Sequence, residues 1–159
     1  MTRKSHHYTK YTGFRCVNCN FYVSIDPMVA GVQNRNHCPH CLWSKHMDLN
    51  EAGDRLAACK AKMQPIGLSI KQTRKKYGPA SLGELMLIHR CVECGKVTIN
   101  RIAADDDAAL IYKIYMESHA IDVQLKSLLE TSGIRPLGLA DIEIVRTQLF
   151  GKIAENDLV

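Results

Sequence analysis

Six of the seven cysteines in this 159-residue chain form three Cys-x-x-Cys pairs, which are Cys16/Cys19, Cys38/Cys41 and Cys91/Cys94. A Cys-x-x-Cys pair at a tight turn brings two thiolates to one side of the backbone, where they can occupy two corners of a tetrahedral metal site. The first two pairs are separated by 18 residues, a spacing typical of zinc ribbons. We therefore predict that the first two pairs form one zinc site.

The third pair, Cys91/Cys94, needs two further donors, and Cys59 is the only cysteine left to supply one of them. A histidine must complete this second site, so that seven cysteines and one histidine give two closed sets of four donors. We favour His46 as the eighth ligand, because it comes from another segment and ties that segment to the third pair. The alternative is His89, which lies two residues before Cys91.

Two other uses of paired cysteines fit the sequence less well. The chain has no apolar run long enough to span a membrane and no signal peptide, so we expect a cytoplasmic, reducing location in which disulfides are rare. Thioredoxin-like redox chemistry uses one pair in a strand-to-helix context, whereas this chain has three. Sites closed by four protein ligands are structural by default, so we predict two structural zinc ions and no catalytic residue.

Charge is divided unequally along the chain. Residues 1–101 carry 16 Lys/Arg and 6 Asp/Glu, whereas residues 102–159 carry 5 Lys/Arg and 10 Asp/Glu. A basic half that also holds every cysteine is typical of a nucleic-acid-binding surface, and the absence of a recognition-helix pattern there favours structured RNA or a ribonucleoprotein over DNA. The predicted contacts are Arg35, Arg74, Lys75, Lys76 and Arg101.

Two other functions remain open from the sequence. A metal-dependent hydrolase or nuclease could use the acidic run Asp105–Asp107 together with His37 or His40, although acids at a helix start are more often caps. Alternatively, the C-terminal helices could dock onto a protein partner. We expect no interaction with a membrane.

The elements that must position these residues follow from hydrophobic periodicity. Short apolar runs over 21–25, 65–70, 85–89 and 96–100 predict strands of an antiparallel meander with cysteine pairs at its turns. Apolar residues at helical spacing after 107 and over about 140–154 predict two C-terminal helices, the first with a break near His119. We therefore predict an α+β fold: a flexible basic arm over 1–12, a zinc-ribbon-like β meander over 13–104 and a helical extension over 105–159.

The residues Arg35-Asn36-His37-Cys38-Pro39 spell RNHCP, and around them the chain resembles the bacterial RNHCP domain family. The resemblance covers about residues 13–110. The family usually has Cys-Gly-Gly where this chain has Cys59-Lys60-Ala61. The resemblance implies zinc binding. The other segments of this chain that resemble the family are Phe14–Cys19, Leu42–Ser44, His46 with Asp48, Gly53–Arg55, Met63–Pro65, Leu87–Cys91, Cys94-Gly95 and Asn100-Arg101.

Overall fold

The computed structural model describes residues 13–47, 59–72 and 83–151, which fold into two antiparallel sheets followed by helices. This α+β architecture confirms the predicted fold class. The elements in chain order are β1 (Gly13–Arg15), β2 (Tyr22–Ser24), α1 (Pro27–Ala30), β3 (Ser44–Lys45), β4 (Lys62–Lys71), β5 (Glu84–Cys91), β6 (Val97–Arg101), α2 (Ala108–Glu117), η1 (Ser118–Ala120), α3 (Val123–Thr131), η2 (Leu139–Asp141) and α4 (Ile142–Phe150).

The first sheet is a small hairpin in which β1 pairs with β2. The chain then enters α1, a single turn that the side chain of Asp26 caps by accepting a 2.9 Å hydrogen bond from the amide of Met28. Gly31 ends this turn with a φ of 68°, a left-handed conformation that glycine adopts without steric cost. The cap fixes the direction in which the chain continues toward Arg35.

The second sheet has the strand order β3-β4-β5-β6, and every pairing is antiparallel. Its strand β5 is covered on both faces, because residues 85–89 are all buried. Successive side chains of a strand point to opposite faces. Accordingly, Leu85 and Leu87 join one apolar cluster while Ile88 joins another.

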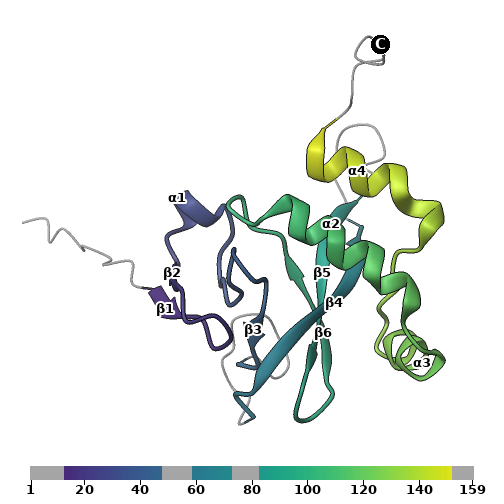
Figure 1. Ribbon diagram of the computed structural model, residues 1–159, viewed down its shortest axis with the longest axis horizontal. Helices are drawn as coiled ribbons and strands as arrows, with labels where there is room; N and C mark the ends of the chain where they lie inside the picture. Colours follow the sequence, from purple (N-terminus) through teal and green to yellow (C-terminus); the bar gives the residue numbers. More distant parts are fainter. Residues whose placement is uncertain (1–12, 48–58, 73–82, 152–159) are drawn as a thin grey trace, which may run out of the picture.

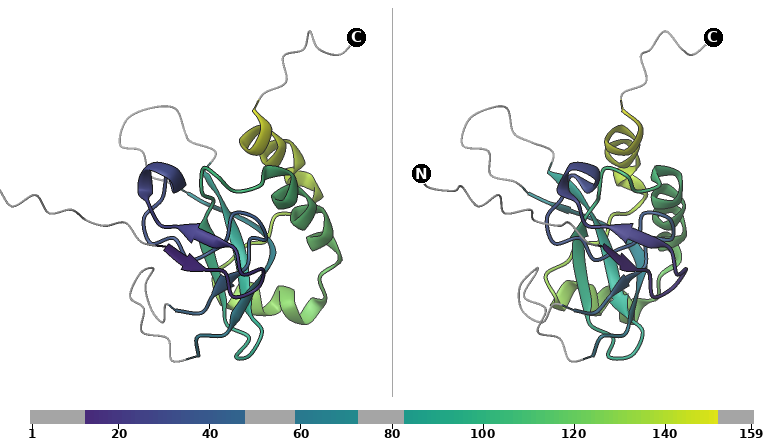
Figure 2. Two further views of the ribbon diagram at one scale, coloured as in Figure 1. Left: turned by 60° about the vertical axis from the view of Figure 1, so that its left-hand side comes forward. Right: turned by 90° about the vertical axis from the view of Figure 1, so that its left-hand side faces the viewer.

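The C-terminal helices complete both apolar clusters. Helix α2 contributes Ile111 and Tyr115, and α4 contributes Val145, to the cluster around Leu85 and Leu87. Helix α3 covers Ile88 with its buried face. In the view of Figure 1 the helices α2–α4 are drawn to the right of β1, β2 and α1, with the long β4–β5 ribbon between them, and Figure 2 shows the same elements from two other directions.

The predicted break near His119 is present as η1, which separates α2 from α3. The second predicted helix corresponds to α4, whereas α3 continues the apolar periodicity that followed residue 107. The division between residues 104 and 105 stays a prediction, and the arm over 1–12 lies outside the described residues. None of the helices in the described part of the chain has the length and apolar character that a membrane span needs.

Candidate metal centres

The three Cys-x-x-Cys turns share one backbone hydrogen-bond pattern. In each turn the amide of the first cysteine donates to the carbonyl five residues ahead, and the amide four residues ahead donates back to the carbonyl of that cysteine. All six hydrogen bonds are 2.8–3.0 Å long. Each turn is therefore a tight knuckle that holds both thiols on one side. The first cysteines of these knuckles are Cys16, Cys38 and Cys91.

A left-handed residue makes each knuckle possible. The residue directly after the second cysteine has positive φ in all three cases. Only Gly95 is a glycine, so the other two positions carry some backbone strain that the fold must offset. The φ values are 62° at Asn20, 63° at Leu42 and 77° at Gly95.

A fourth knuckle is formed by residues that are distant in the sequence. The amide of His46 donates to the carbonyl of Ala61 at 2.8 Å, and the amide of Lys60 donates to the carbonyl of His46 at 3.1 Å. Lys60 has a φ of 49°, like the residues that follow the other second cysteines. His46 thus takes the place of a first cysteine and Cys59 that of a second. In this knuckle the segment 47–58 separates the first ligand from the second, whereas in the other three knuckles only two residues do.

The four knuckles combine in pairs into two clusters. The first cluster contains Cys16, Cys19, Cys38 and Cys41, and the second contains His46, Cys59, Cys91 and Cys94. Within each cluster all four candidate ligand atoms lie within 4.8 Å of one another. The first cluster joins the turn between β1 and β2 to the turn that precedes β3, while the second joins residues that flank β3 and β4 to the turn between β5 and β6.

The separations of the donor atoms fit a tetrahedral zinc ion. A Zn–S bond of about 2.3 Å gives tetrahedral S···S edges of about 3.8 Å, and a Zn–N bond of about 2.0 Å gives an S···N edge of about 3.5 Å. The Sγ atoms are 3.4 Å apart for Cys16 and Cys41, and 3.5 Å apart for Cys59 and Cys91. These separations are far longer than the 2.05 Å of a disulfide bond. The donor set therefore suits metal ions, and two zinc ions account for it.

His46 directs one ring nitrogen at the second cluster. Its Nδ1 lies 3.4 Å from the Sγ of Cys94, whereas its Nε2 is buried with no hydrogen-bond partner in the described part of the chain. A metal ion bound at Nδ1 would give this buried imidazole a strong partner. This geometry places His46, rather than His89, at the second metal site.

Each cluster contains one thiol that ionises readily. Burial opposes ionisation of Cys91, but the backbone amides of Cys94 and Glu93 outweigh it and bring the pKa of the thiol down to about 6. For Cys16, burial is likewise outweighed by the amides of Cys19 and Asn18, so its pKa is lowered. Because the thiolate is the form that binds metal, the lowered pKa favours metal binding at Cys16 and Cys91, whereas burial raises the pKa of Cys38 and of Cys41.

The chain matches the RNHCP domain over residues 11–112, which is more than half of its length. It belongs to the RNHCP domain family. Comparisons with curated proteins and with solved structures gave no match. All eight ligand candidates of the two clusters lie within the matched residues, so the metal sites are part of the RNHCP domain itself.

His89 of the RNHCP domain has a structural role. It is fully buried. Its Nε2 donates to the carbonyl of Leu42 at 2.7 Å, and its Nδ1 accepts from the side-chain Nδ2 of Asn100 at 2.9 Å. Both ring nitrogens are therefore occupied. Burial, with a smaller contribution from His37, lowers the pKa of His89 to about 3, so its imidazole is neutral. The alternative that His89 is the eighth ligand is wrong.

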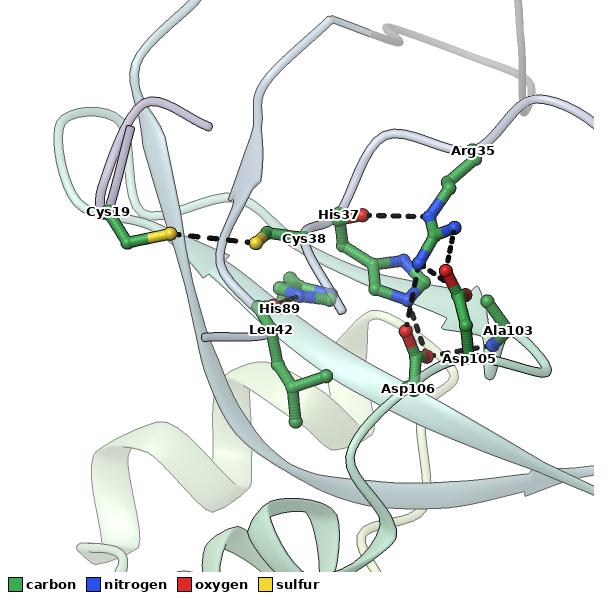
Figure 3. Close-up of polar contacts among 9 residues, drawn as sticks. All are labelled: Cys19, Arg35, His37, Cys38, Leu42, His89, Ala103, Asp105 and Asp106. Carbon is green, nitrogen blue, oxygen red and sulfur yellow. Dashed lines mark hydrogen bonds and ion pairs between the residues drawn. The ribbon is translucent and has the colours of Figure 1, made fainter. Parts of the chain in front are cut away.

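The motif residues Arg35 and His37 form a buried ionic network with the start of α2 (Figure 3). The guanidinium of Arg35 lies 2.7 Å from Asp105 and 3.3 Å from Asp106, and its Nε donates to the carbonyl of His37. The ring of His37 is 2.6 Å from Asp106, which also accepts from the amide of Ala103. The network joins the second knuckle of the first cluster to the helical part of the chain.

This network corrects one prediction of a nucleic-acid contact. The side chain of Arg35 is 0% exposed, so its guanidinium does not reach a nucleic acid, and that prediction is wrong. Arg101 is 58% exposed and forms an ion pair with Glu84 at 2.8 Å. The predicted contacts Arg74, Lys75 and Lys76 lie outside the described residues.

The acidic run proposed for a hydrolase has structural partners. Asp107 caps α2 by accepting from the amide of Leu110, as expected for an acid at a helix start. Asp105 and Asp106 bind Arg35, while His40 packs edge-on against Phe21 with ring centroids 3.9 Å apart. These contacts give the acids and His40 roles in stabilising the fold.

Proposed function

We propose that this RNHCP domain is a zinc-stabilised module that binds structured RNA through a basic row beside the second metal site. The basic row consists of Lys45, Lys62 and Arg90. In the sheet Lys45 lies opposite Lys62, and Arg90 lies opposite Gln64. Opposed residues share a face, as do residues two apart in one strand, so the row projects from one face. This row is the observation that carries the proposal.

Neighbouring side chains strengthen the positive character of this region. Lys60, which directly follows Cys59, is exposed, as are Lys62 and Arg90. Among the described residues of the segments 44–47, 59–64 and 90–97, Glu93 is the one acid. Phosphate groups supply most of the affinity in sequence-independent RNA binding, and exposed Lys and Arg side chains are their usual partners.

The charge of the metal sites must be included in this balance. Seven thiolates contribute seven negative charges and two zinc ions four positive ones, which is a net change of −3. The charge of residues 1–101, +10 when the thiols are counted as neutral, therefore falls to +7. The zinc-loaded basic half keeps enough positive charge to attract a polyanion.

Exposed aromatic side chains near the first metal site offer a way to hold unpaired bases. Phe21 is 46% and Tyr22 is 52% exposed, and the guanidinium carbon of Arg15 lies 5.8 Å from the centre of the Tyr22 ring. Bases of looped RNA stack on aromatic rings and guanidinium planes. This group supports RNA with unpaired bases as the ligand.

Structured RNA fits the fold better than duplex DNA does. Proteins that read the major groove usually insert a helix. Within residues 13–104 the described part of the chain has one helix, α1, which is only four residues long. Strands and knuckles are better suited to recognising the shape of a folded RNA and its loops.

The test is binding of the zinc-loaded chain to fluorescein-labelled bulk transfer RNA, followed by fluorescence anisotropy over a series of salt concentrations. We expect affinity to fall steeply with salt, and the Lys62→Glu/Arg90→Glu variant to bind at least roughly tenfold more weakly with a shallower salt slope. The control, Lys126→Glu/Arg135→Glu, makes the same change of charge on the helical side and should bind like the wild type.

Two results would contradict the proposal. One is the absence of binding at about 50 mM salt, where phosphate contacts are strong. The other is an equal loss of affinity in the control variant, which would mean that net charge alone governs binding.

A further inference from the structure

A cleft of about 810 Å³ lies between the loop that carries the RNHCP motif and the edge of the four-stranded sheet. One wall is formed by the residues from Gly31 to His37, and the other by β5 and β6. Its volume is within the range of about 300–1,000 Å³ that small-molecule sites usually have. The metal clusters do not line it, so the cleft is a separate feature of the domain.

The lining of the cleft combines three kinds of chemistry. Val32 and Met86, 7% and 4% exposed, supply an apolar surface. Lys71 and Arg101 supply positive charge. Carboxamide side chains, which can both donate and accept hydrogen bonds, come from both walls. They belong to Gln33, Asn34, Asn36 and Asn100, and the Asn100 side-chain nitrogen also donates to His89.

Among the residues that the structure describes, no carboxylate lines this cleft. The nearby acids are already engaged by other partners: Asp105 and Asp106 bind Arg35 behind the loop, and Glu84 binds Arg101. The exposed Lys71, together with the guanidinium donors of Arg101 that Glu84 leaves free, favours a ligand that carries negative charge. The carboxamide side chains further favour a ligand that has both hydrogen-bond donors and hydrogen-bond acceptors.

The wall from Gly31 to His37 is held in place from behind. The amide of Ala104 donates to the carbonyl of Ala30 at 2.7 Å, next to the left-handed Gly31. Arg35 donates to the carbonyl of His37 and binds both acids at the start of α2. A wall fixed by such contacts loses little conformational freedom when a ligand binds.

We propose that this cleft binds one unpaired nucleotide of an RNA, with the base against Val32 and Met86, the base edge on the carboxamides and the phosphate near Lys71 and Arg101. Carboxamide side chains are suited to reading base edges because they donate and accept at adjacent atoms. The inference rests on the proposed function, since it names the part of the RNA that this site receives. A free nucleoside monophosphate has the same chemistry and serves as the probe.

The experiment records amide spectra of the zinc-loaded chain while AMP, GMP, CMP or UMP is added, with ribose 5-phosphate and inorganic phosphate in parallel. We expect resonances of residues 31–37 and 99–101 to shift with at least one nucleotide, and to shift much less with the two phosphates. Equal shifts with phosphate alone would mean an anion site without base recognition and would overturn the proposal. So would the absence of shifts in these residues.

Matched variants then test the carboxamide contact. Asn34 has a φ of 54° and Asn20 a φ of 62°, and both are exposed, so glycine removes each side chain without straining the backbone. Asn34→Gly should weaken nucleotide binding roughly tenfold, as loss of a base-edge contact does, while Asn20→Gly leaves it unchanged. Equal affinities of the two variants would contradict a carboxamide contact at residue 34.

The nucleotide titration and the transfer RNA binding test can fail independently of each other. If transfer RNA binds through the basic row but nucleotides do not shift the cleft resonances, the nucleotide site is wrong and the RNA-binding function stands. If nucleotides bind the cleft but transfer RNA does not bind, the RNA-binding function is wrong and the cleft is a site for free nucleotides.

Discussion

The Nε2 atom of His89 donates a 2.7 Å hydrogen bond to the carbonyl of Leu42, the left-handed residue of the second knuckle. This contact connects the central strand β5 to a turn that holds two candidate zinc ligands. It also fixes the tautomer of the ring, because Nδ1 faces the Asn100 side chain. His89 therefore supports a knuckle of the first metal site, although it lies two residues before Cys91 of the second metal site.

The two histidines should respond differently to substitution. We predict that His46→Ala lowers the zinc content from two ions to one per chain, because the second cluster loses one of its four donors. His89→Ala should keep two ions and lower the free energy of unfolding by about 2–4 kcal/mol, since it leaves a cavity and the unpaired Leu42 carbonyl. Elemental analysis and denaturant titration measure the two effects. If His89→Ala lost an ion while His46→Ala kept both, the ligand assignment would be reversed.

The Arg35 network predicts a large cost for removing one buried charge. Arg35→Ala leaves Asp106, whose side chain is 0% exposed, without its guanidinium partner and should destabilise the fold by about 3 kcal/mol or more. The control is Arg101→Ala, whose ion pair with Glu84 is largely exposed and should contribute less than about 1 kcal/mol. Chemical denaturation of both zinc-loaded variants checks this difference. Equal costs would argue against a buried network.

Substitutions at two equivalent knuckle positions should change the stability of the protein in opposite directions. Lys60 and Gly95 both have left-handed backbones, with φ values of 49° and 77°. Lys60→Gly should stabilise the zinc-loaded protein by up to about 1 kcal/mol, because it relieves strain, and Gly95→Ala should destabilise it by a similar amount. Thermal unfolding of the two variants measures the changes. A Lys60→Gly variant that is markedly less stable would contradict the fourth knuckle.

Removal of metal should affect the helices as well as the cysteine-rich part. Helices α2 and α4 share an apolar cluster with Leu42, Leu68, Leu85 and Leu87. Structural zinc sites contribute on the order of 10 kcal/mol each to folding. We therefore predict that a chelator abolishes the helical circular dichroism signal together with the zinc, and that added zinc restores it. Helical signal that persists after complete chelation would show instead that the helices fold independently.

The sequence predicted the first metal cluster well, because two Cys-x-x-Cys pairs at zinc-ribbon spacing have few other uses. It also predicted β2, β4, β5 and β6, since runs such as Leu85 to His89 are short, apolar and bounded by turn residues, but it missed the two- and three-residue strands β3 and β1, which are too short to show a pattern. Donor counting then showed that one histidine was needed. It could not decide between His46 and His89, because the deciding fact is a knuckle closed across the segment 47–58.

The buried network was harder to predict. Nothing local in the sequence distinguishes an arginine that binds phosphate from one that binds Asp105 and Asp106, about seventy residues away. The pairing of Arg35 with these acids arises only when α2 packs beside the second knuckle. A basic residue flanking a cysteine knuckle is therefore weak evidence for a nucleic-acid contact until its burial is known.

The central claim is that seven cysteines and His46 form two closed metal sites. Its most direct test is the metal content of the purified chain, measured by mass spectrometry under native conditions together with elemental analysis. We predict two zinc ions per chain, with one lost in His46→Ala and one in Cys16→Ser. A wild-type chain that binds a single ion, or none, after equilibration with zinc would contradict it.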